Sequence, residues 1–298
     1  MSKQFPLISI VTPSYNQANF LEATIQSVIS QNYPNLEYII IDGGSTDGSI
    51  EIIKKFQEYL HFWCSEPDKG QYDAINKGFT HATGEIMAWI NSDDMYCPWA
   101  FRTVASIMSE LPQVEWLTTL QPGGWDWNSF CSGFGSISGY SKEAFLDVCY
   151  LPSNQKFIGW IQQESTFWRR SLWQKADSYI RTDLNLAGDF DLWARFYRHE
   201  ELYGTNSPLG GFRSQINQKT QFIDRYICEA MNSLSIMQEL ENWHPNYYRE
   251  MIIYLKLNKI PKLRNILKQV NGYSGKRVVR QNMNTPNSFW EVEDYKFF

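Results

Sequence analysis

The sequence lacks the features that mark membrane-spanning, disulfide-stapled and zinc-stabilised proteins. No apolar stretch approaches the roughly 20 residues that a spanning helix requires. The polar segment Met1 to Pro6, followed by the short apolar run Leu7 to Val11, does not resemble a signal peptide. The five cysteines are an odd number without CxxC spacing, which argues against a disulfide framework and a structural zinc site. We therefore expect a cytoplasmic protein, soluble or peripheral at the inner face of the membrane.

Positive charge is scarce outside one segment. The formal net charge of −5 argues against nucleic acid as a partner. Residues 249–280 nevertheless contain nine Lys or Arg and a single acidic residue, Glu250. Such a stretch can dock on an anionic membrane, form a contact between subunits, or be a solvated helix face. The sequence leaves these alternatives, and the oligomeric state, open.

The first hundred residues alternate β-branched runs with helical patterns. Apolar runs predict strands over residues 7–11, 37–41 and 85–90, and apolar side chains at helical spacing predict helices over 20–30 and 49–60. This alternation is typical of βαβ units. We expect an α/β fold with a Rossmann-like, mainly parallel central sheet flanked by helices.

The second part of the chain is less regular. Residues 122–139 are rich in Gly, Ser, Trp and Asn and predict a long loop, which in compact domains often binds ligands. The Gly-rich turn at 43–48 is either a strand-to-helix turn or a loop that binds phosphate through its N–H groups. It contains neither the GxGxxG nor the P-loop motif of known phosphate-binding loops. Further helices are predicted over residues 141–148, 190–197, 247–257 and 261–270, followed by a polar end.

Adjacent carboxylates follow the predicted strand 85–90. Asp93 and Asp94 would lie at the carboxyl end of a parallel strand, where open α/β sheets bind their ligands. Two such groups can hold Mg²⁺ or Mn²⁺, which would neutralise a departing diphosphate. Alternatively, one of them caps the helix that follows.

Two other acidic positions allow both a functional and a structural interpretation. Asp42 closes the strand 37–41 and either accepts hydrogen bonds from a base or ribose, or forms the turn before Gly43. Asp189 lies at the start of a predicted helix, with Asp191 two residues on. A carboxylate there can act as a general base or can simply cap the helix.

Taken in order, these segments resemble the family 2 glycosyltransferases with the GT-A fold. Several linked motifs in one order are more specific than any one of them, and together they span residues 7 to about 100, with weaker similarity to about 220. The motifs are VTPSYN (11–16), SVISQNYP (27–34), IDGGSTDGS (41–49), SEPDKGQYDAINKG (65–78), ATGE (82–85) and NSDD (91–94).

The resemblance implies roles for individual residues. Asp189 would be the catalytic base, with Gly188 where the family often has Glu, and Asp93 and Asp94 would hold Mn²⁺ or Mg²⁺. The acceptor side would include Glu164, Arg169 and Asp191. The donor nucleotide would be contacted by Thr12, Pro13, Tyr15, Asp42, Asp68, Lys69, Asn76 and Asp93.

Two positions depart from the family's common pattern, and a motif of the processive synthases is absent. Asn91 occupies the place of the first Asp of a DxD-like motif, and Gln215 occupies the place of a His that can help to hold the metal. The QxxRW motif of processive synthases is absent, which favours the addition of one sugar per encounter.

The implied organisation is a GT-A catalytic domain over residues 1–220, with a nucleotide-binding half (1–100) and an acceptor-binding half (101–220). Residues 221–298 would form a helical extension. The implied reaction is inverting transfer of a sugar from a nucleotide-diphosphate donor, most simply a UDP-sugar, to a hydroxyl of a glycan or lipid-linked acceptor during polysaccharide or glycoconjugate assembly.

Two other classes of function stay open. A sugar-phosphate nucleotidyltransferase would also use a nucleotide-binding α/β sheet, although its Gly-rich signature with Arg near the N-terminus is missing. A non-catalytic nucleotide-sugar or glycan-binding relative is compatible with Asn91 and Gln215.

Overall fold

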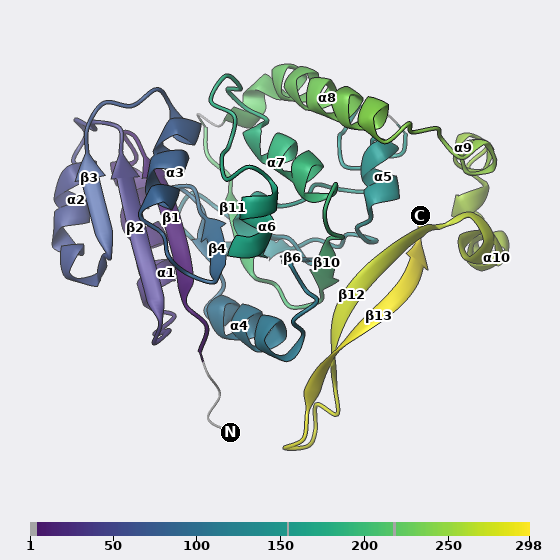
Figure 1. Ribbon diagram of the computed structural model, residues 1–298, viewed down its shortest axis with the longest axis horizontal. Coiled ribbons are helices and arrows are strands. Elements are labelled where there is room, and N and C mark those ends of the chain that lie inside the picture. The colour runs from purple at the N-terminus through teal and green to yellow at the C-terminus, as the bar shows by residue number, and fades with distance from the viewer. Residues whose placement is uncertain (1–4, 154, 217–218) are drawn as a thin grey trace.

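The computed structural model describes residues 5–153, 155–216 and 219–298 (Figure 1). Residues 1–4 lie outside this part, so the expectation for residues 1–6 falls largely beyond it. The strands are β1 (Ile8–Ser14), β2 (Leu36–Asp42), β3 (Phe62–Ser65), β4 (Ile86–Trp89), β5 (Met95–Tyr96), β6 (Trp116–Thr119), β7 (Gly123–Trp125), β8 (Cys131–Phe134), β9 (Phe167–Arg169), β10 (Tyr203–Thr205), β11 (Gly210–Arg213), β12 (Tyr273–Gln281) and β13 (Phe289–Phe297).

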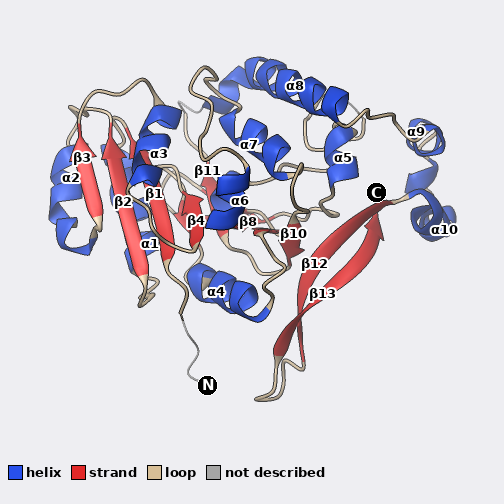
Figure 2. Cartoon of the chain, in the orientation of Figure 1, coloured by secondary structure: helices blue, strands red, loops and turns tan. Residues whose placement is uncertain are grey.

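The helices cover both faces of the sheet that these strands build (Figure 2). Four short 3₁₀ segments occur as well, Gln57–Tyr59, Gln163–Ser165, Lys219–Phe222 and Leu257–Lys259. The α-helices are α1 (Ala18–Ile29), α2 (Ser49–Lys55), α3 (Gln71–Thr80), α4 (Ala100–Glu110), α5 (Lys142–Leu146), α6 (Arg170–Lys175), α7 (Gly188–Phe196), α8 (Ile223–Leu240), α9 (Tyr247–Tyr254) and α10 (Pro261–Asn271).

Nine strands form the central sheet, in the order β13-β12-β10-β6-β9-β4-β1-β2-β3. Among the strands of this sheet in the described part of the chain, only β9 and β13 run antiparallel to their neighbours. The prediction of an α/β fold with a mainly parallel sheet is confirmed. β1 is buried at every position, as expected for an inner parallel strand covered on both faces.

The register aligns the strand ends that carry the sequence motifs. Ser14 of β1 pairs with Asp42 of β2, and Asp42 pairs with Ser65 of β3. On the other side of β1, Val11 pairs with Trp89 at the end of β4. The carboxyl ends of four parallel strands therefore meet at one edge, which is where a ligand can be reached by several loops.

The predicted loop over 122–139 contains two short strands. β7 and β8 join β5 and β11 in a second, four-stranded sheet of order β5-β11-β7-β8. The prediction of a loop was wrong at these strands, because Gly123, Gly124 and Gly133 interrupt the alternation that marks a strand in sequence. Gly123 is required by packing, since a Cβ there would lie 2.7 Å from the carbonyl oxygen of Gly210.

The expected helical extension over residues 221–298 needs correction. Helices α8, α9 and α10 are present, but the last segment forms the hairpin β12–β13, which extends the central sheet through the pairing of β12 with β10. Figure 1 shows this hairpin projecting from the body. Its strands are rich in charged residues and only partly buried, so they show no clean apolar alternation that would predict strand.

An aromatic cluster fills the core beneath the motif-bearing edge. The rings of Trp89 and Trp193 stack with centroids 5.9 Å apart, and Trp168 meets both edge-on. These rings join β4 and β9 of the sheet to α7, so the helix that carries Asp189 is fixed to the sheet by large buried surfaces. Within the described ranges, no helix has the length and apolar character needed to cross a bilayer.

Candidate active site

Two cavities meet at the carboxyl edge of the sheet. The first, of about 690 Å³, is called the strand-end pocket and is lined by the loops after β1, β2, β3 and β4. The second, of about 520 Å³, is called the aromatic pocket and is lined by Trp89, Trp160, Tyr226 and neighbouring side chains. Both are lined by Gln71, Asn91 and Phe212, so the two pockets form one continuous cleft.

Four of the predicted nucleotide contacts line the strand-end pocket. Pro13 and Tyr15 come from the end of β1 and the loop after it, Asp68 from the loop after β3, and Asp93 from the loop after β4. Asp68 approaches the backbone closely at Gly43, where a Cβ would lie 2.7 Å from its carboxylate. A side chain at position 43 would require the Asp68 carboxylate to shift.

Asp42 is fully buried and does not line this pocket. Its carboxylate accepts hydrogen bonds from the N–H of Gly44 at 3.1 Å and of Ser45 at 2.8 Å. It also accepts from the hydroxyls of Ser45 and Ser65. The turn-forming interpretation of Asp42 matches these contacts, since its oxygens hold the Gly43–Ser45 turn in shape.

Three other predicted contacts do not line either pocket. Thr12 is buried, with its hydroxyl 3.1 Å from that of Tyr38. The Asn76 side chain bonds to both the N–H and the carbonyl of Ile180, each at 2.7 Å. Lys69 is exposed, and its backbone N–H donates to Asp73. Thr12 and Asn76 thus hold the scaffold together.

The turn after β4 presents one carboxylate to the pocket and buries the other. Asp93 lines the pocket and accepts a hydrogen bond from the amide of Gln215. Asp94 is buried and accepts from the backbone N–H of Arg213 at 2.9 Å and from the amide of Asn91 at 3.1 Å. Gln215 therefore lies at the NSDD motif.

The two carboxylates of this turn repel each other. Burial raises the pKa of Asp94 well above its ordinary value, and the charges of Asp93 and Glu164 raise it further. The hydrogen bonds from Arg213 and Asn91 act in the opposite direction. Burial lowers the pKa of the Arg213 guanidinium, which lies against this turn. A cation at Asp93 would relieve the repulsion between the two carboxylates.

The donor atoms available here suit a hard divalent cation shared with a phosphate ligand. Among the described residues, no group of three or more His, Cys, Asp and Glu side chains gathers as a metal site. The carboxylate of Asp93 supplies oxygen, the ligand that Mg²⁺ and Mn²⁺ prefer. One carboxylate completed by phosphate oxygens is a common arrangement for Mg²⁺, so the residues present fit such an ion.

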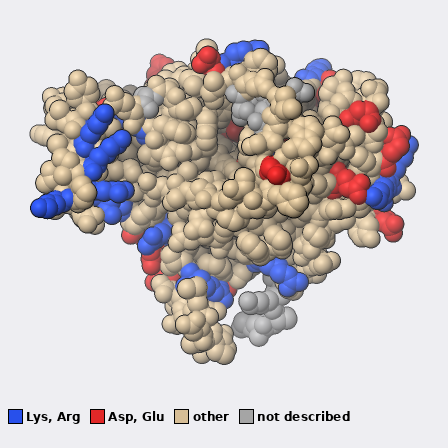
Figure 3. Space-filling model, turned by 180° about the vertical axis from the view of Figure 1, so that it is seen from behind, with Lys and Arg blue, Asp and Glu red and all other residues tan. Residues whose placement is uncertain are grey.

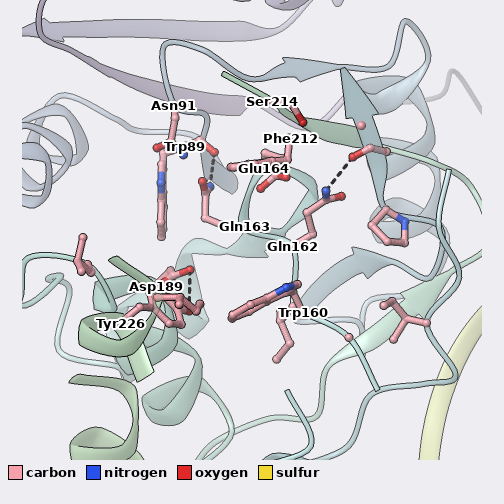
Figure 4. Close-up of a pocket in the computed structure, with 18 of the residues that line it drawn as sticks. Trp89, Asn91, Trp160, Gln162, Gln163, Glu164, Asp189, Phe212, Ser214 and Tyr226 are labelled. Atoms are coloured by element: carbon pink, nitrogen blue, oxygen red, sulfur yellow. Dashed lines mark hydrogen bonds between the residues drawn. The ribbon is translucent and has the colours of Figure 1, made fainter. Parts of the chain in front are cut away.

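The aromatic pocket is built around Asp189 at the start of α7. The hydroxyl of Tyr226, from α8, donates to both carboxylate oxygens of Asp189, at 3.3 and 3.4 Å. Burial raises the pKa of Asp189 to about 6, while the hydrogen bonds from Phe190 N–H and from Tyr226 limit the rise. Figure 4 shows Asp189 beside Tyr226, across the cavity from Glu164. A carboxylate with this pKa can accept a proton near neutral pH.

The backbone before Asp189 is held by residues from two other helices. The hydroxyl of Tyr72 accepts from the N–H of Gly188 at 2.9 Å and donates to the carbonyl of Leu186 at 2.6 Å. A Cβ at position 188 would lie 2.7 Å from the Tyr72 ring, which explains glycine at this position. The carboxylate of Glu229, on α8, accepts from three consecutive backbone N–H groups of residues 185–187.

Glu164 is the second acidic side chain of the aromatic pocket. It is buried, and its Oε1 has no hydrogen-bond partner among the described residues. Burial raises its pKa to about 8, and the charges of Asp189 and Asp93 add to the rise. A protonated carboxyl at this position can donate a hydrogen bond to a ligand hydroxyl.

The other two residues assigned to the acceptor side lie outside both pockets. Arg169 forms an ion pair with Glu85 and donates to the carbonyls of Met108 and Val114. Asp191 lies 3.0 Å from Arg195 and accepts a hydrogen bond from Ser233 at 2.9 Å. Neither side chain enters the proposal below, because both are already engaged in fixing β9 and α7.

Several residues of the site carried no signal in the sequence. Tyr226 and Glu229 come from α8, beyond the expected end of the catalytic domain, and Phe212 comes from β11. Their positions depend on contacts between segments far apart in the chain. Gln71 lies within a quoted motif, but only the structure shows its side chain in the cleft, where it donates to the Asn91 amide oxygen at 2.6 Å.

Comparison with known proteins agrees with this geometry. Residues 9–122 match the sequence profile described as Glycosyl transferase family 2. Residues 9–122 of this chain therefore form a domain of that family. Its GT-A fold is likewise confirmed, since solved glycosyltransferases superpose on most of the chain.

Curated relatives match parts of this chain. An uncharacterized glycosyltransferase from Mycobacterium tuberculosis is 38% identical over 92 residues, or 30% of this chain and 35% of the relative. One from Rickettsia typhi is 28% identical over 68% of this chain and 63% of the relative. The putative teichuronic acid biosynthesis glycosyltransferase TuaG of Bacillus subtilis is 37% identical over 32% of this chain and 39% of the relative. This chain thus spans about a third to two thirds of the length of these relatives.

Solved structures match more of this chain, at lower sequence identity. The S. aureus TarS fragment 1–349 in complex with UDP-GlcNAc has a TM-score of 0.60 and 17% identity, and covers 88% of this chain and 75% of its own. The mannosyltransferase PcManGT from Pyrobaculum calidifontis, in complex with GDP-Man and Mn²⁺, has a TM-score of 0.56 and 17% identity, and covers 86% of this chain and 70% of its own. At these identities the likeness is one of fold.

Proposed function

We propose that this chain is an inverting glycosyltransferase that moves a sugar from a nucleotide-diphosphate donor, most simply a UDP-sugar, to a hydroxyl of a glycan or lipid-linked acceptor. One observation carries the proposal. Asp93 and Asp189 line adjoining pockets that share Gln71, Asn91 and Phe212 as a common wall. A donor phosphate and an acceptor hydroxyl can therefore be held on opposite sides of one sugar.

The donor would occupy the strand-end pocket. Pro13, Tyr15 and Asp68 would contact the nucleotide, and Asp93 would hold Mn²⁺ or Mg²⁺ together with the diphosphate. The ion would stabilise negative charge on the leaving phosphate oxygens. Asp94 would position Asp93 through the shared turn, which the Thr24 hydroxyl of α1 fixes by donating to the carbonyls of Ser92 and Asp94.

The acceptor would occupy the aromatic pocket, where its hydroxyl meets Asp189. The Asp189 carboxylate removes the hydroxyl proton while the acceptor oxygen forms its bond to the anomeric carbon. The bond from that carbon to the phosphate oxygen breaks on the opposite side, and its electron pair remains on the diphosphate. A single displacement of this kind inverts the anomeric configuration.

The two halves of the chain correspond only in part to the donor and acceptor sides. Residues 1–100 would supply most of the donor side and residues 101–220 most of the acceptor side. Gln71 and Asn91 from the first half also line the aromatic pocket, and Tyr226 completes it from beyond residue 220. The transferase unit is therefore proposed to include α8.

A panel of UDP-, GDP- and dTDP-sugars tests the proposed activity. With Mn²⁺ or Mg²⁺ present, a preferred donor should raise the Tm and should slowly release its nucleoside diphosphate to water. A donor at about 100 times its Kd stabilises the folded state by about 2.7 kcal/mol. Stabilisation without any release of diphosphate, over long incubation with candidate acceptors, would instead favour a binding protein.

The rate should depend on pH with two limbs. We expect kcat/KM to rise through about pH 6, because the base Asp189 must be deprotonated. It should fall through about pH 8, because ionisation of Glu164 removes a hydrogen-bond donor and adds negative charge beside the reacting groups. Initial rates at subsaturating donor and acceptor, measured from pH 5 to 9.5, give this profile.

Two variants test which side chain causes each limb of the pH profile. Glu164→Gln keeps a donor without an ionisable proton, so the alkaline limb should disappear while the acid limb stays. Tyr226→Phe removes the hydroxyl that lowers the pKa of Asp189, so the acid limb should move to higher pH. An unchanged pH profile in both variants would show that these side chains do not determine the pH dependence of the reaction.

A further inference from the structure

The basic segment 249–280 separates into two sets of cations in the folded chain. Arg249 pairs with Glu143 and Asp147, and three more cations have carboxylate partners in Asp294, Glu293 and Glu110. The second set has no carboxylate within ion-pair distance among the described residues, and residues 251–272 contain no Asp or Glu. This set consists of Lys256, Lys259, Lys262, Arg264 and Lys268.

Helix α10 presents an apolar stripe that the protein does not cover. Leu263, Ile266, Leu267 and Val270 recur at the i, i+3, i+4 and i+7 spacing of one helical face. Leu263, Ile266 and Val270 are 40%, 64% and 73% exposed, and α10 has no buried residue. An amphipathic helix normally turns such a stripe toward the core, so this one is available to a partner.

The cations of α10 flank this stripe. At about 100° per residue, Lys262 and Arg264 lie roughly 100° to either side of Leu263 on the helical wheel. Their long aliphatic stems can lie along an apolar surface while the charged ends reach outward. This arrangement is typical of a helix that lies in the interface between water and lipid headgroups.

Helix α9, which contacts α10, also exposes aromatic side chains. Tyr247, Tyr248 and Tyr254 are 70%, 73% and 73% exposed, and Leu255 is 53% exposed. Exposed tyrosines place an apolar ring and a polar hydroxyl together, which suits the headgroup region of a bilayer. Figure 3 shows Lys and Arg gathered over α9 and α10 at the left end of the view.

We propose that α9 and α10 form a docking face for an anionic lipid surface. A second copy of this face would bring five uncompensated cations against five more, which electrostatics opposes. An anionic bilayer offers negative headgroups to the cations and an apolar boundary to the stripe. It therefore matches both properties of the face at once.

The docking face is joined to the candidate active site by one ion pair. Lys156 pairs with Glu250 of α9, and the residue after Lys156 is Phe157, which lines the aromatic pocket with Trp160. Both rings are partly exposed, at 37% and 38%. If the proposed function holds, docking brings the acceptor pocket close to lipid-linked substrates, but the docking itself does not depend on catalysis.

Vesicle binding without donor or acceptor tests the proposal. The full chain should co-float with vesicles of phosphatidylglycerol and phosphatidylcholine, and much less with phosphatidylcholine alone. Each Lys or Arg near an anionic surface contributes roughly five-fold in affinity, so Lys262→Glu/Arg264→Glu should weaken binding by at least about ten-fold. Lys54→Glu/Arg102→Glu makes the same charge change at exposed cations on α2 and α4 and should leave binding unchanged.

A second variant tests the apolar stripe at exposed positions, where substitution should leave the fold intact. Ile266→Ser/Val270→Ser alters only exposed side chains, so its Tm should match the parent while vesicle binding falls by about ten-fold or more. Equal binding to neutral vesicles, or unchanged binding by both α10 variants, would overturn the proposal. So would a dimer in sedimentation that Ile266→Ser/Val270→Ser dissociates, combined with no binding of the parent to anionic vesicles. A failed sugar-transfer assay has no bearing on these outcomes.

Discussion

Asp189→Asn should lower kcat by about 10²- to 10⁴-fold while leaving donor affinity close to that of the parent. The amide is nearly the same size as the carboxylate but cannot take the proton of the acceptor hydroxyl. It can still accept from Tyr226, whose hydroxyl lies 3.3 Å from Asp189 Oδ1, so the pocket should keep its shape. Initial rates give kcat, and the donor-induced rise in Tm reports binding.

The control for this variant is Asp183→Asn, the same chemical change at an exposed carboxylate that pairs with Arg181 outside both pockets. It should keep the parent's rate within about two-fold, since an exposed ion pair contributes at most about 1 kcal/mol to stability. Near-normal transfer by Asp189→Asn would show that the base is another group. The proposed function would survive that result, but the mechanism would not.

Asp93→Asn should lower kcat/KM by about 100-fold or more. Neutralising Asp93 removes the one carboxylate of its turn that lines the strand-end pocket, so the divalent ion would be held by the donor diphosphate alone. Stabilisation of a leaving phosphate by such an ion is worth several kcal/mol, and each 1.36 kcal/mol is ten-fold in rate. Rates at a series of Mn²⁺ concentrations should show a higher metal requirement in the variant.

Thermal shifts separate this effect from general damage. The parent should show a larger nucleotide-induced rise in Tm with Mn²⁺ than with a chelator, and Asp93→Asn should lose most of that difference. Without nucleotide, its Tm should stay at or above the parent's, because the change relieves the repulsion between Asp93 and buried Asp94. A variant that keeps the full Mn²⁺ dependence would exclude Asp93 as the metal-binding residue.

Local sequence signals were sufficient for the donor side of the fold. β1, β2 and β4 are short apolar runs bounded by turn residues, and the structure forms strands at all three. Helix α1 also lies where apolar spacing predicted it, as does α7 on the acceptor side. On the donor side β1, β2 and β3 are each followed by a helix, so neighbours in sequence are neighbours in space.

Individual side-chain roles were much harder to predict. Asp42, Asn76 and Asp191 look like ligands in the sequence, yet each satisfies its polar atoms within the protein. Asp93 and Asp94 are adjacent and chemically identical, but the turn exposes the first to the pocket and buries the second. Whether a carboxylate faces a ligand or the scaffold depends on the backbone around it, which no local pattern specifies.

By itself, the sequence determined the fold class, the family resemblance and the edge of the sheet where Asp93 lies, because these depend on residues close together along the chain. Only the tertiary structure decided that Tyr226 of α8 contacts Asp189, that buried Glu164 lines the same pocket, and that the end of the chain adds a hairpin to the sheet. Those features join segments that lie tens of residues apart along the chain. Their energies come from burial and long-range pairing, which appear only when the whole chain has folded.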